Sequence, residues 1–245
     1  MRIDLNSDLG EGAGYDDEIL ELVSSANIAC GLHAGTPASI YTSIESAKKH
    51  GVSVGAHPSF DDRKNFGRTE VQISPAEVFA IVTYQLGAFS AMCRAVGVEM
   101  NHVKPHGALY NMAARDRTMA EPVVYAVRDS DPAPVVFAPP GSFLELVARE
   151  LNLRTAAEFF ADRNYNADGS LVSRTQPTAL LRDADASAER VMRMLREKTV
   201  RAIDGTDVNI SAETVCIHGD TPGAVEFARR LRQRLEAEGI LIAPP

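Results

Sequence analysis

The 245-residue sequence contains no tryptophan, only three cysteines and no long hydrophobic run. The cysteines (Cys30, Cys93 and Cys216) are far apart and form no C-x-x-C pair, which is typical of a reducing compartment and argues against a disulfide framework. The longest apolar strings, such as residues 133–140, have strand length, so none approaches the roughly 18 apolar residues of a membrane span. The first residues also lack the apolar core of a signal peptide. We therefore expect a cytoplasmic protein that does not bind a membrane.

Positive charge is also scarce. The sequence has 25 Lys and Arg against 33 Asp and Glu, a formal net charge of -8, and no Lys/Arg-rich run. Nucleic-acid binding is therefore not expected, because it needs a basic surface. The sequence also lacks a G-x-x-x-x-G-K-[ST] loop, a protein-kinase signature set and an H-E-x-x-H pair. Thus no local motif predicts the binding of a nucleotide or of a zinc ion.

Short strand-like runs alternate with helix-like runs along the whole chain. The predicted strands are residues 3–8, 27–33, 52–57, 100–106, 134–138, 155–162 and 214–218. The predicted helices are residues 37–50, 75–96, 142–151, 186–198 and 222–238. This alternation predicts a parallel sheet with right-handed crossovers. Seven such units in 245 residues favour a TIM-like, seven-stranded (β/α) barrel, with an open doubly wound sheet as the alternative.

The chain has no linker, repeat or change of composition, so we expect one domain over residues 1–245. The segment 164–176 is predicted to be a hairpin or lid, because Asn166, Asp168 and Gly169 have turn chemistry. Long loops after barrel strands are where lids are found.

Polar residues share one face on strand after strand, because side chains of a strand alternate between its two faces. The alternation groups Asp4, Asn6 and Asp8; Asn27 and His33; His102, Lys104 and His106; Glu158 and Asp162; and Cys216 and His218. The apolar faces must pack on the helices, so the polar faces point into the barrel. Charged groups are costly to bury unless they are paired or solvated. The pattern therefore predicts a polar cavity.

Six predicted strands also end in an ionisable residue, namely Asp8, His33, His57, His106, Asp162 and His218. The carboxyl ends of barrel strands form the rim where active sites lie. Taken singly, a strand-end Asp is often a helix N-cap and a strand-end His is often structural; their convergence favours a site. Lys104 is expected either to pair with a carboxylate or to bind an anion, and Arg68 either to bind a substrate carboxylate or to be solvated. His50, at a helix end, is given no function.

Several segments at these positions resemble the LamB/YcsF family. They are residues 4–12 (DLNSDLGEG), 26–35 (ANIACGLHAG), 55–58 (GAHP), 66–68 (FGR), 103–111 (VKPHGALYN), 158–163 (EFFADR) and 218–220 (HGD). Members of the family are the A-type subunit of the bacterial ATP-dependent 5-oxoprolinase. The resemblance implies a (β/α) barrel of the glycoside hydrolase/deacetylase type. It also implies cleavage of 5-oxo-L-proline to L-glutamate with hydrolysis of ATP to ADP and phosphate, in a complex with two further subunits, B and C. The chain departs from the family pattern at Thr36, Asn65 and Thr69.

The candidate site follows from the pattern and the resemblance together. Its catalytic residues are expected to be Asp8, His33, His57, Lys104, His106, Asp162 and His218. Its substrate-binding residues are expected to be Asn6, Glu11, Asn27, Arg68, Glu158, Arg163 and Asp220. The carboxylates would supply a general base, the histidines would move protons and the cations would hold anions. ATP is expected as co-substrate, bound by this chain or by a partner, and a divalent metal is left open.

Two other functions remain open from the sequence. A metal-dependent hydrolase or deacetylase would use Asp8, His57 and His106 as ligands, and stoichiometric zinc that resists dialysis would favour it. A non-catalytic subunit that binds a small molecule is the third hypothesis. In that case Asp8→Asn would weaken binding only, whereas an acid–base enzyme would lose turnover and still bind its ligand.

Overall fold

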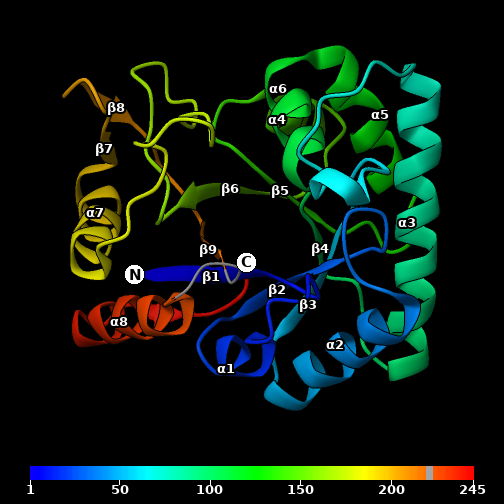
Figure 1. The fold of residues 1–245 in the computed structure, drawn as a ribbon, viewed down its shortest axis with the longest axis horizontal. Helices are drawn as coiled ribbons and strands as arrows, with labels where there is room; N and C mark the ends of the chain where they lie inside the picture. Colours follow the sequence, from blue (N-terminus) through cyan, green and yellow to red (C-terminus); the bar gives the residue numbers. More distant parts are fainter. Residues whose placement is uncertain (219–222) are drawn as a thin grey trace.

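The computed structural model describes residues 1–218 and 223–245. Seven parallel strands close into a barrel in the order β1-β2-β3-β4-β5-β6-β9, with β9 pairing back onto β1 (Figure 1). Their bounds are β1 Arg2–Leu9, β2 Ser25–Ala29, β3 Ser53–His57, β4 His102–Val103, β5 Val135–Ala138, β6 Thr155–Phe160 and β9 Thr214–His218. The predicted seven-stranded (β/α) barrel is confirmed, and the open sheet is wrong.

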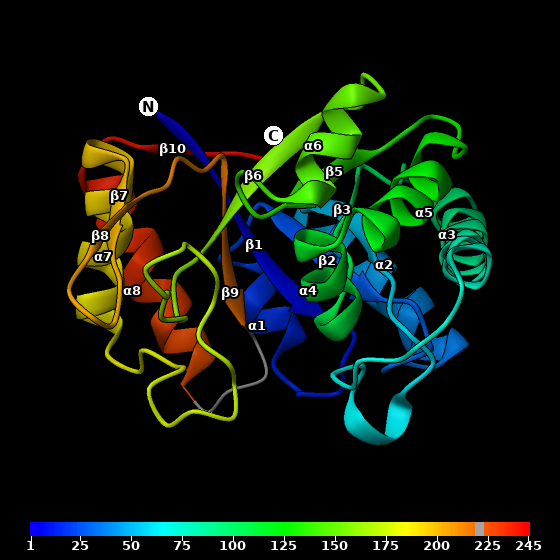
Figure 2. The ribbon, with the colours of Figure 1, turned by 90° about the horizontal axis from the view of Figure 1, so that it is seen from above.

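Helices surround the barrel (Figure 2). Their bounds are α1 Asp16–Leu20, α2 Pro37–His50, α3 Pro75–Val96, α4 Gly107–Arg115, α5 Arg117–Arg128, α6 Phe143–Glu150, α7 Ala184–Glu197 and α8 Ala224–Ala237. Thr36 and Ser74 accept the N3 backbone N–H of α2 and α3 in capping boxes, and Gly51 and Gly97 end these helices with left-handed φ of 70° and 78°. These local signals explain why both helices begin and end where the sequence predicted.

Several elements were not predicted. They are α1, α4, α5, the 3-10 helix η1 (Arg63–Asn65), the antiparallel pair β7 (Thr199–Arg201) and β8 (Asp207–Asn209), and β10 (Leu241–Ile242), which pairs with the start of β1. Three predicted strands also end earlier than expected, and one of them, β6, ends at Phe160. β2 ends at Ala29, before Gly31 adopts a φ of 94°, and β4 ends at Val103, close to Pro105, which has no backbone N–H. His33 and His106 therefore lie in loops, beyond the strands that were expected to carry them.

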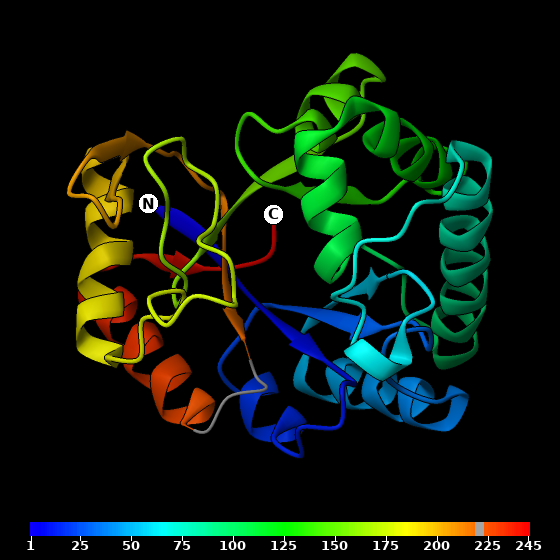
Figure 3. The same ribbon diagram turned by 45° about the horizontal axis from the view of Figure 1, so that its top comes forward.

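The segment after β6 runs between α7 and the barrel strands (Figure 3). Tyr165 and Leu171 form an antiparallel bridge, and the backbone N–H of Gly169 donates to the carbonyl of Asn166 at 3.0 Å. These contacts make a tight turn at the tip of the predicted hairpin. A role of this segment as a lid stays a prediction.

The core lies between the outer faces of the strands and the inner faces of the helices. Val82, Leu86 and Phe89 of α3 are buried there, and each such side chain contributes roughly 1.5–3 kcal/mol. α3 also has the length and the mean hydropathy, 1.3, of a membrane span, which corrects the expectation that no segment of the chain approaches one. Core helices of soluble proteins in general pass the same test, so the length and composition of α3 carry no further conclusion.

Candidate functional site

The interior of the barrel is polar from its amino end. Asp4 on β1 accepts hydrogen bonds from the hydroxyls of Ser24 at 2.7 Å, Ser25 at 2.8 Å and Thr214 at 2.5 Å. Burial raises the pKa of Asp4 to about 6, and these three hydroxyls limit the rise. The lowest layer is thus a carboxylate held by hydroxyl groups from neighbouring strands.

Amide side chains form the next layer. Asn27 Nδ2 donates to Asn6 Oδ1 at 2.7 Å, His102 Nε2 donates to Asn27 Oδ1 at 2.9 Å, and Asn6 Nδ2 donates to Glu158 Oε1 at 3.1 Å. The sequence suggested Asn6 and Asn27 as substrate-binding residues. Both side chains are 0% exposed. Asn6 donates a hydrogen bond to Glu158 and Asn27 donates one to Asp8, so these contacts position the two carboxylates beneath the rim.

Lys104 links the carboxylates above this layer. Its Nζ lies 2.8 Å from Asp8 Oδ1, 3.0 Å from Glu158 Oε1 and 3.0 Å from Cys216 Sγ, and Tyr110 donates to the other oxygen of Glu158 at 2.7 Å. Burial opposes ionisation of both partners, but His57 and Lys104 hold the pKa of Asp8 well below its usual range, and Asp8 raises the pKa of Lys104. Burial raises the pKa of Cys216, which therefore remains a neutral thiol. The result is a buried ammonium shared by two carboxylates.

Three histidines lie at the rim beside Lys104 and Asp8. His57 Nδ1 donates to the Lys104 carbonyl at 2.6 Å and His106 Nε2 donates to the Phe66 carbonyl at 2.8 Å, while His33 Nδ1 lies 2.9 Å from Ser59 Oγ. Burial lowers the pKa of His33 to about 3 and lowers that of His106 as well, so both rings are neutral at pH 7. Their remaining ring nitrogens face Glu11, whose Oε1 lies 3.0 Å from His33 Nε2 and 3.4 Å from His106 Nδ1.

An acid–histidine pair closes the other side of the site. His218 Nδ1 lies 2.8 Å from Asp162 Oδ2, and His218 Nε2 lies 4.0 Å from Asp8 Oδ2. Burial of Asp162 is outweighed by His218, which lowers the pKa of that carboxyl. A carboxylate at Nδ1 fixes the ring so that Nε2 faces the site, as in acyl-transfer enzymes.

The two arginines of the candidate site lie at its edge. The Arg68 guanidinium stacks 4.8 Å from the centre of the Phe66 ring, which itself contacts His33 and His106. Arg163 is buried and donates to the Val172 carbonyl at 2.7 Å. Burial and the nearby Arg174 lower the pKa of Arg163 to about 10, so it stays charged at pH 7. Asp220, the remaining candidate, lies outside the described residues.

The structure thus gathers Asp8, His57, Lys104 and His218 around one space. Sequence reasoning overlooked Tyr110 and Ser59. Tyr110 lies in the first turn of α4, whose N-cap is His106, but α4 was not predicted. Asp162 lies two residues beyond the end of β6, in the loop and not on the strand as expected.

The three departures from the family pattern have local structural roles. The Thr36 hydroxyl accepts the Ser39 backbone N–H at 3.2 Å and caps α2. Asn65 Nδ2 and the Thr69 backbone N–H donate to the Asp62 carboxylate at 2.8 Å and 3.1 Å. These contacts are within the loops that carry Arg68 and His33.

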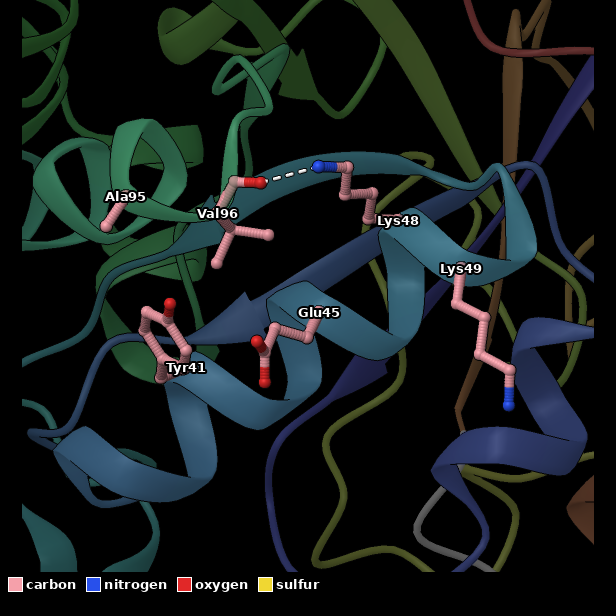
Figure 4. Close-up of a pocket in the computed structure, with 6 residues that line it drawn as sticks. All are labelled: Tyr41, Glu45, Lys48, Lys49, Ala95 and Val96. Carbon is pink, nitrogen blue, oxygen red and sulfur yellow. Dashed lines mark hydrogen bonds between the residues drawn. The ribbon is translucent and has the colours of Figure 1, made fainter.

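A depression of about 430 Å³ lies on the outside of the barrel between α2 and α3 (Figure 4). In it Lys48 Nζ donates to the Val96 carbonyl at 2.6 Å, and a cation at the C-terminus of α3 is favoured by the helix dipole. This contact explains Lys48 as a structural residue. The depression lies apart from the charged groups of the barrel interior.

Comparison with known proteins places this chain in a family. The chain is similar to the crystal structure of a lactam utilization protein from Thermus thermophilus, with a TM-score of 0.93 and 46% identity over 99% of both chains. A deacetylase, T48, solved with its substrate, shares the fold alone, with a TM-score of 0.53 and 12% identity over 99% of this chain and 87% of the other. The model of the LamB/YcsF family matches residues 3–245. The chain therefore belongs to the LamB/YcsF family.

Proposed function

We propose that this protein is the A-type subunit of an ATP-dependent 5-oxoprolinase, which opens 5-oxo-L-proline to L-glutamate together with two further subunits. The observation that carries the proposal is the buried ammonium of Lys104, which lies between Asp8 and Glu158 and close to the Asp162–His218 pair. The similarity to a protein named for lactam utilization supports a cyclic amide as the substrate class.

The chemistry of a lactam explains why such a site needs both a general base and a cation. The carbonyl carbon of an unstrained amide is a poor electrophile. Transfer of the γ-phosphoryl group of ATP to the amide oxygen would make that carbon reactive and release ADP. Water would then attack the carbon, and the ring C–N bond would break as the nitrogen takes up a proton, which leaves an acyl phosphate. A second water would hydrolyse the acyl phosphate to the carboxylate of glutamate and inorganic phosphate. The attacking water requires a base, and the developing negative charge requires a fixed cation.

The residues divide these tasks according to their contacts. His218 is the general base, because Asp162 holds its Nδ1 and leaves Nε2 toward the space beside Asp8. Lys104 stabilises negative charge on the reacting oxygen. Arg68 and Arg163, at the edge of the site, anchor the carboxylate of 5-oxoproline or the phosphate. The chain has no standard nucleotide-binding loop, so we assign the binding of ATP to the assembled complex.

Reconstitution tests the proposal. The purified chain, alone and together with both partner subunits, is incubated with 5-oxoproline and ATP, and glutamate and phosphate are measured. The assembled complex should form both products, and His218→Asn should lower the rate by about 10²-fold or more, whereas His50→Asn should leave it unchanged. If no combination of subunits forms glutamate, the proposed activity is wrong.

A second candidate is a metal-dependent hydrolase of linear amides, favoured by the group formed by Glu11, His33, His57 and His106. A bound divalent ion would supply Lewis-acid chemistry and an activated water. In that case an acetamide substrate should be cleaved by the chain alone, without ATP. Activity that depends strictly on ATP and on the partner subunits would exclude this candidate.

A further inference from the structure

Two histidine nitrogens and a carboxylate face one another at the rim. His57 Nε2 and His106 Nδ1 lie 2.9 Å apart. Glu11 Oε1 lies 3.4 Å from His106 Nδ1 and 3.8 Å from His57 Nε2. All three groups are buried, with side-chain exposures of 6% for Glu11, 1% for His57 and 7% for His106. Together they form a small cluster of donor atoms shielded from water.

The hydrogen bond on the far side of each ring determines which of its two nitrogens carries a proton. His57 Nδ1 and His106 Nε2 each contact a backbone carbonyl oxygen, which only accepts hydrogen bonds, so both of these nitrogens carry protons. His57 Nε2 and His106 Nδ1 therefore lie 2.9 Å apart with at most one proton between them, and Glu11 Oε1 lies beside both. A divalent cation in the place of that proton would be held by all three atoms.

The separations fit a tetrahedral metal ion. Ligand atoms about 2.0–2.1 Å from a tetrahedral zinc ion are ~3.3 Å from one another. The three separations here, 2.9, 3.4 and 3.8 Å, scatter around that value. The planes of the His57 and His106 rings meet at 85°, so lone pairs in the two planes can converge on one point.

His33 contacts the same carboxylate in a different way. Its ring stacks on that of His106, with centroids 3.9 Å apart and an interplanar angle of 3°, so the in-plane lone pairs of the two rings run parallel and do not meet at one ion. His33 Nε2 instead lies 3.0 Å from Glu11 Oε1, and its Nδ1 lies 2.9 Å from the Ser59 hydroxyl, which itself donates to the Phe60 carbonyl. Ligating carboxylates are commonly held by such hydrogen bonds.

We propose that the rim binds one divalent cation of the zinc class through His57 Nε2, His106 Nδ1 and the Glu11 carboxylate, with His33 positioning Glu11. Two imidazoles and one carboxylate, with a coordination position left open, are a ligand set that suits such an ion. A second group of possible metal ligands consists of Asp8, Cys216 and His218. It already holds the ammonium group of Lys104, whose Nζ lies 2.8 Å from Asp8 and 3.0 Å from Cys216. The inference concerns the same rim as the proposed function but does not depend on it.

Metal binding by the full chain tests this proposal without substrate. The protein is stripped with EDTA, titrated with Zn²⁺ or Co²⁺, desalted and analysed for metal content. One equivalent of Zn²⁺ should be retained, and the Co²⁺ form should show the visible absorption of a tetrahedral site. Glu11→Gln, His57→Asn and His106→Asn should lose retention, while His33→Asn should weaken binding about 10–100-fold.

His50→Asn is the matched control, because His50 lies at the end of α2 and contacts the Ser46 carbonyl. It should retain the metal fully. If the ligand variants do not fold, histidine-ring NMR of the wild-type chain replaces them: Zn²⁺ should shift the signals of His57 and His106 and leave that of His50 in place. No retained equivalent in the wild type, retention by His106→Asn, or unmoved ring signals would overturn the proposal. Glutamate formation is measured separately, so either proposal can fail alone.

Discussion

Lys104 balances the charge of two buried carboxylates in the barrel interior. Its ammonium lies within 3.0 Å of Glu158 and 2.8 Å of Asp8, and the side chains of Glu158 and Asp8 are 0% and 7% exposed. Removing one member of a buried ion cluster leaves uncompensated charge, which costs more than the cluster contributes in net stability. The lysine is therefore both a candidate catalytic group and a structural requirement.

We predict that Lys104→Met lowers the free energy of unfolding by about 3–5 kcal/mol, because two carboxylates then share a buried space without their counter-ion. Urea denaturation at pH 7 measures the loss. The double variant Lys104→Met/Glu158→Gln should recover part of it, since it removes one of the charges. A loss below about 1 kcal/mol for the single variant would show that the carboxylates are not held by this ammonium.

Asp4 predicts a pH dependence of stability. Its folded-state pKa of about 6 lies above its ordinary value of 3.8, so the folded state binds the proton more tightly than the unfolded chain does. Its contribution to stability is complete below the ordinary value and is lost as the pH rises through about 6. A difference of about two pKa units corresponds to about 3 kcal/mol.

Asp4→Asn isolates this effect. The difference in unfolding free energy between the wild type and the variant should fall by about 3 kcal/mol between pH 4 and pH 7. Denaturant unfolding of both proteins across this range gives the two curves. Asp8 and Asp162, whose pKa values are lowered, act in the opposite direction in both proteins and so cancel in the difference. Parallel curves would contradict the assignment.

Helices with capping residues at both ends were predicted most completely. The caps at Thr36, Gly51, Ser74 and Gly97 define α2 and α3. The alternation of side chains likewise placed Asp4, Asn6 and Asp8 on the interior face of β1. The ends of β2 and β4 were misjudged because the alternation of side chains continues beyond them, through Leu32 to His33 and through Lys104 to His106. α4 was overlooked because it begins directly at Gly107, after a segment interpreted as a strand. Which ring nitrogen contacts which partner depends on contacts distant in sequence, and no local pattern encodes it.

Strand β3 provides a test of how tightly the interior is packed. A Cβ at Gly55 would lie 2.2 Å from the His102 ring, which is held by Asn27 and stacks 4.2 Å from Phe137. We predict that Gly55→Ala destabilises the protein by about 1–3 kcal/mol, because the ring has no space to move. Gly87→Ala in α3 is the matched control; a Cβ there meets nothing within 4 Å, so thermal unfolding should show no loss or a gain of up to about 1 kcal/mol. Equal effects of the two substitutions would contradict the packing described here.

At the scale of the whole molecule, the barrel brings residues from nearly the whole length of the chain into one polar interior. Asp8 and His218 are on neighbouring strands, β1 and β9, whose pairing closes the barrel. The helices cover the apolar faces, so the charged side chains of the strands have only the interior and the rim in which to lie. Closure of the barrel thus turns a repeated strand pattern into a single site.

A crystal structure of the chain with bound 5-oxoproline would show whether the barrel interior and its rim form that single site. The ligand should lie at the rim, with its amide within hydrogen-bond distance of Lys104 or His218 and its carboxylate held by an arginine at the edge of the site. A ligand bound only on the outside of the barrel, for example between α2 and α3, would contradict this prediction.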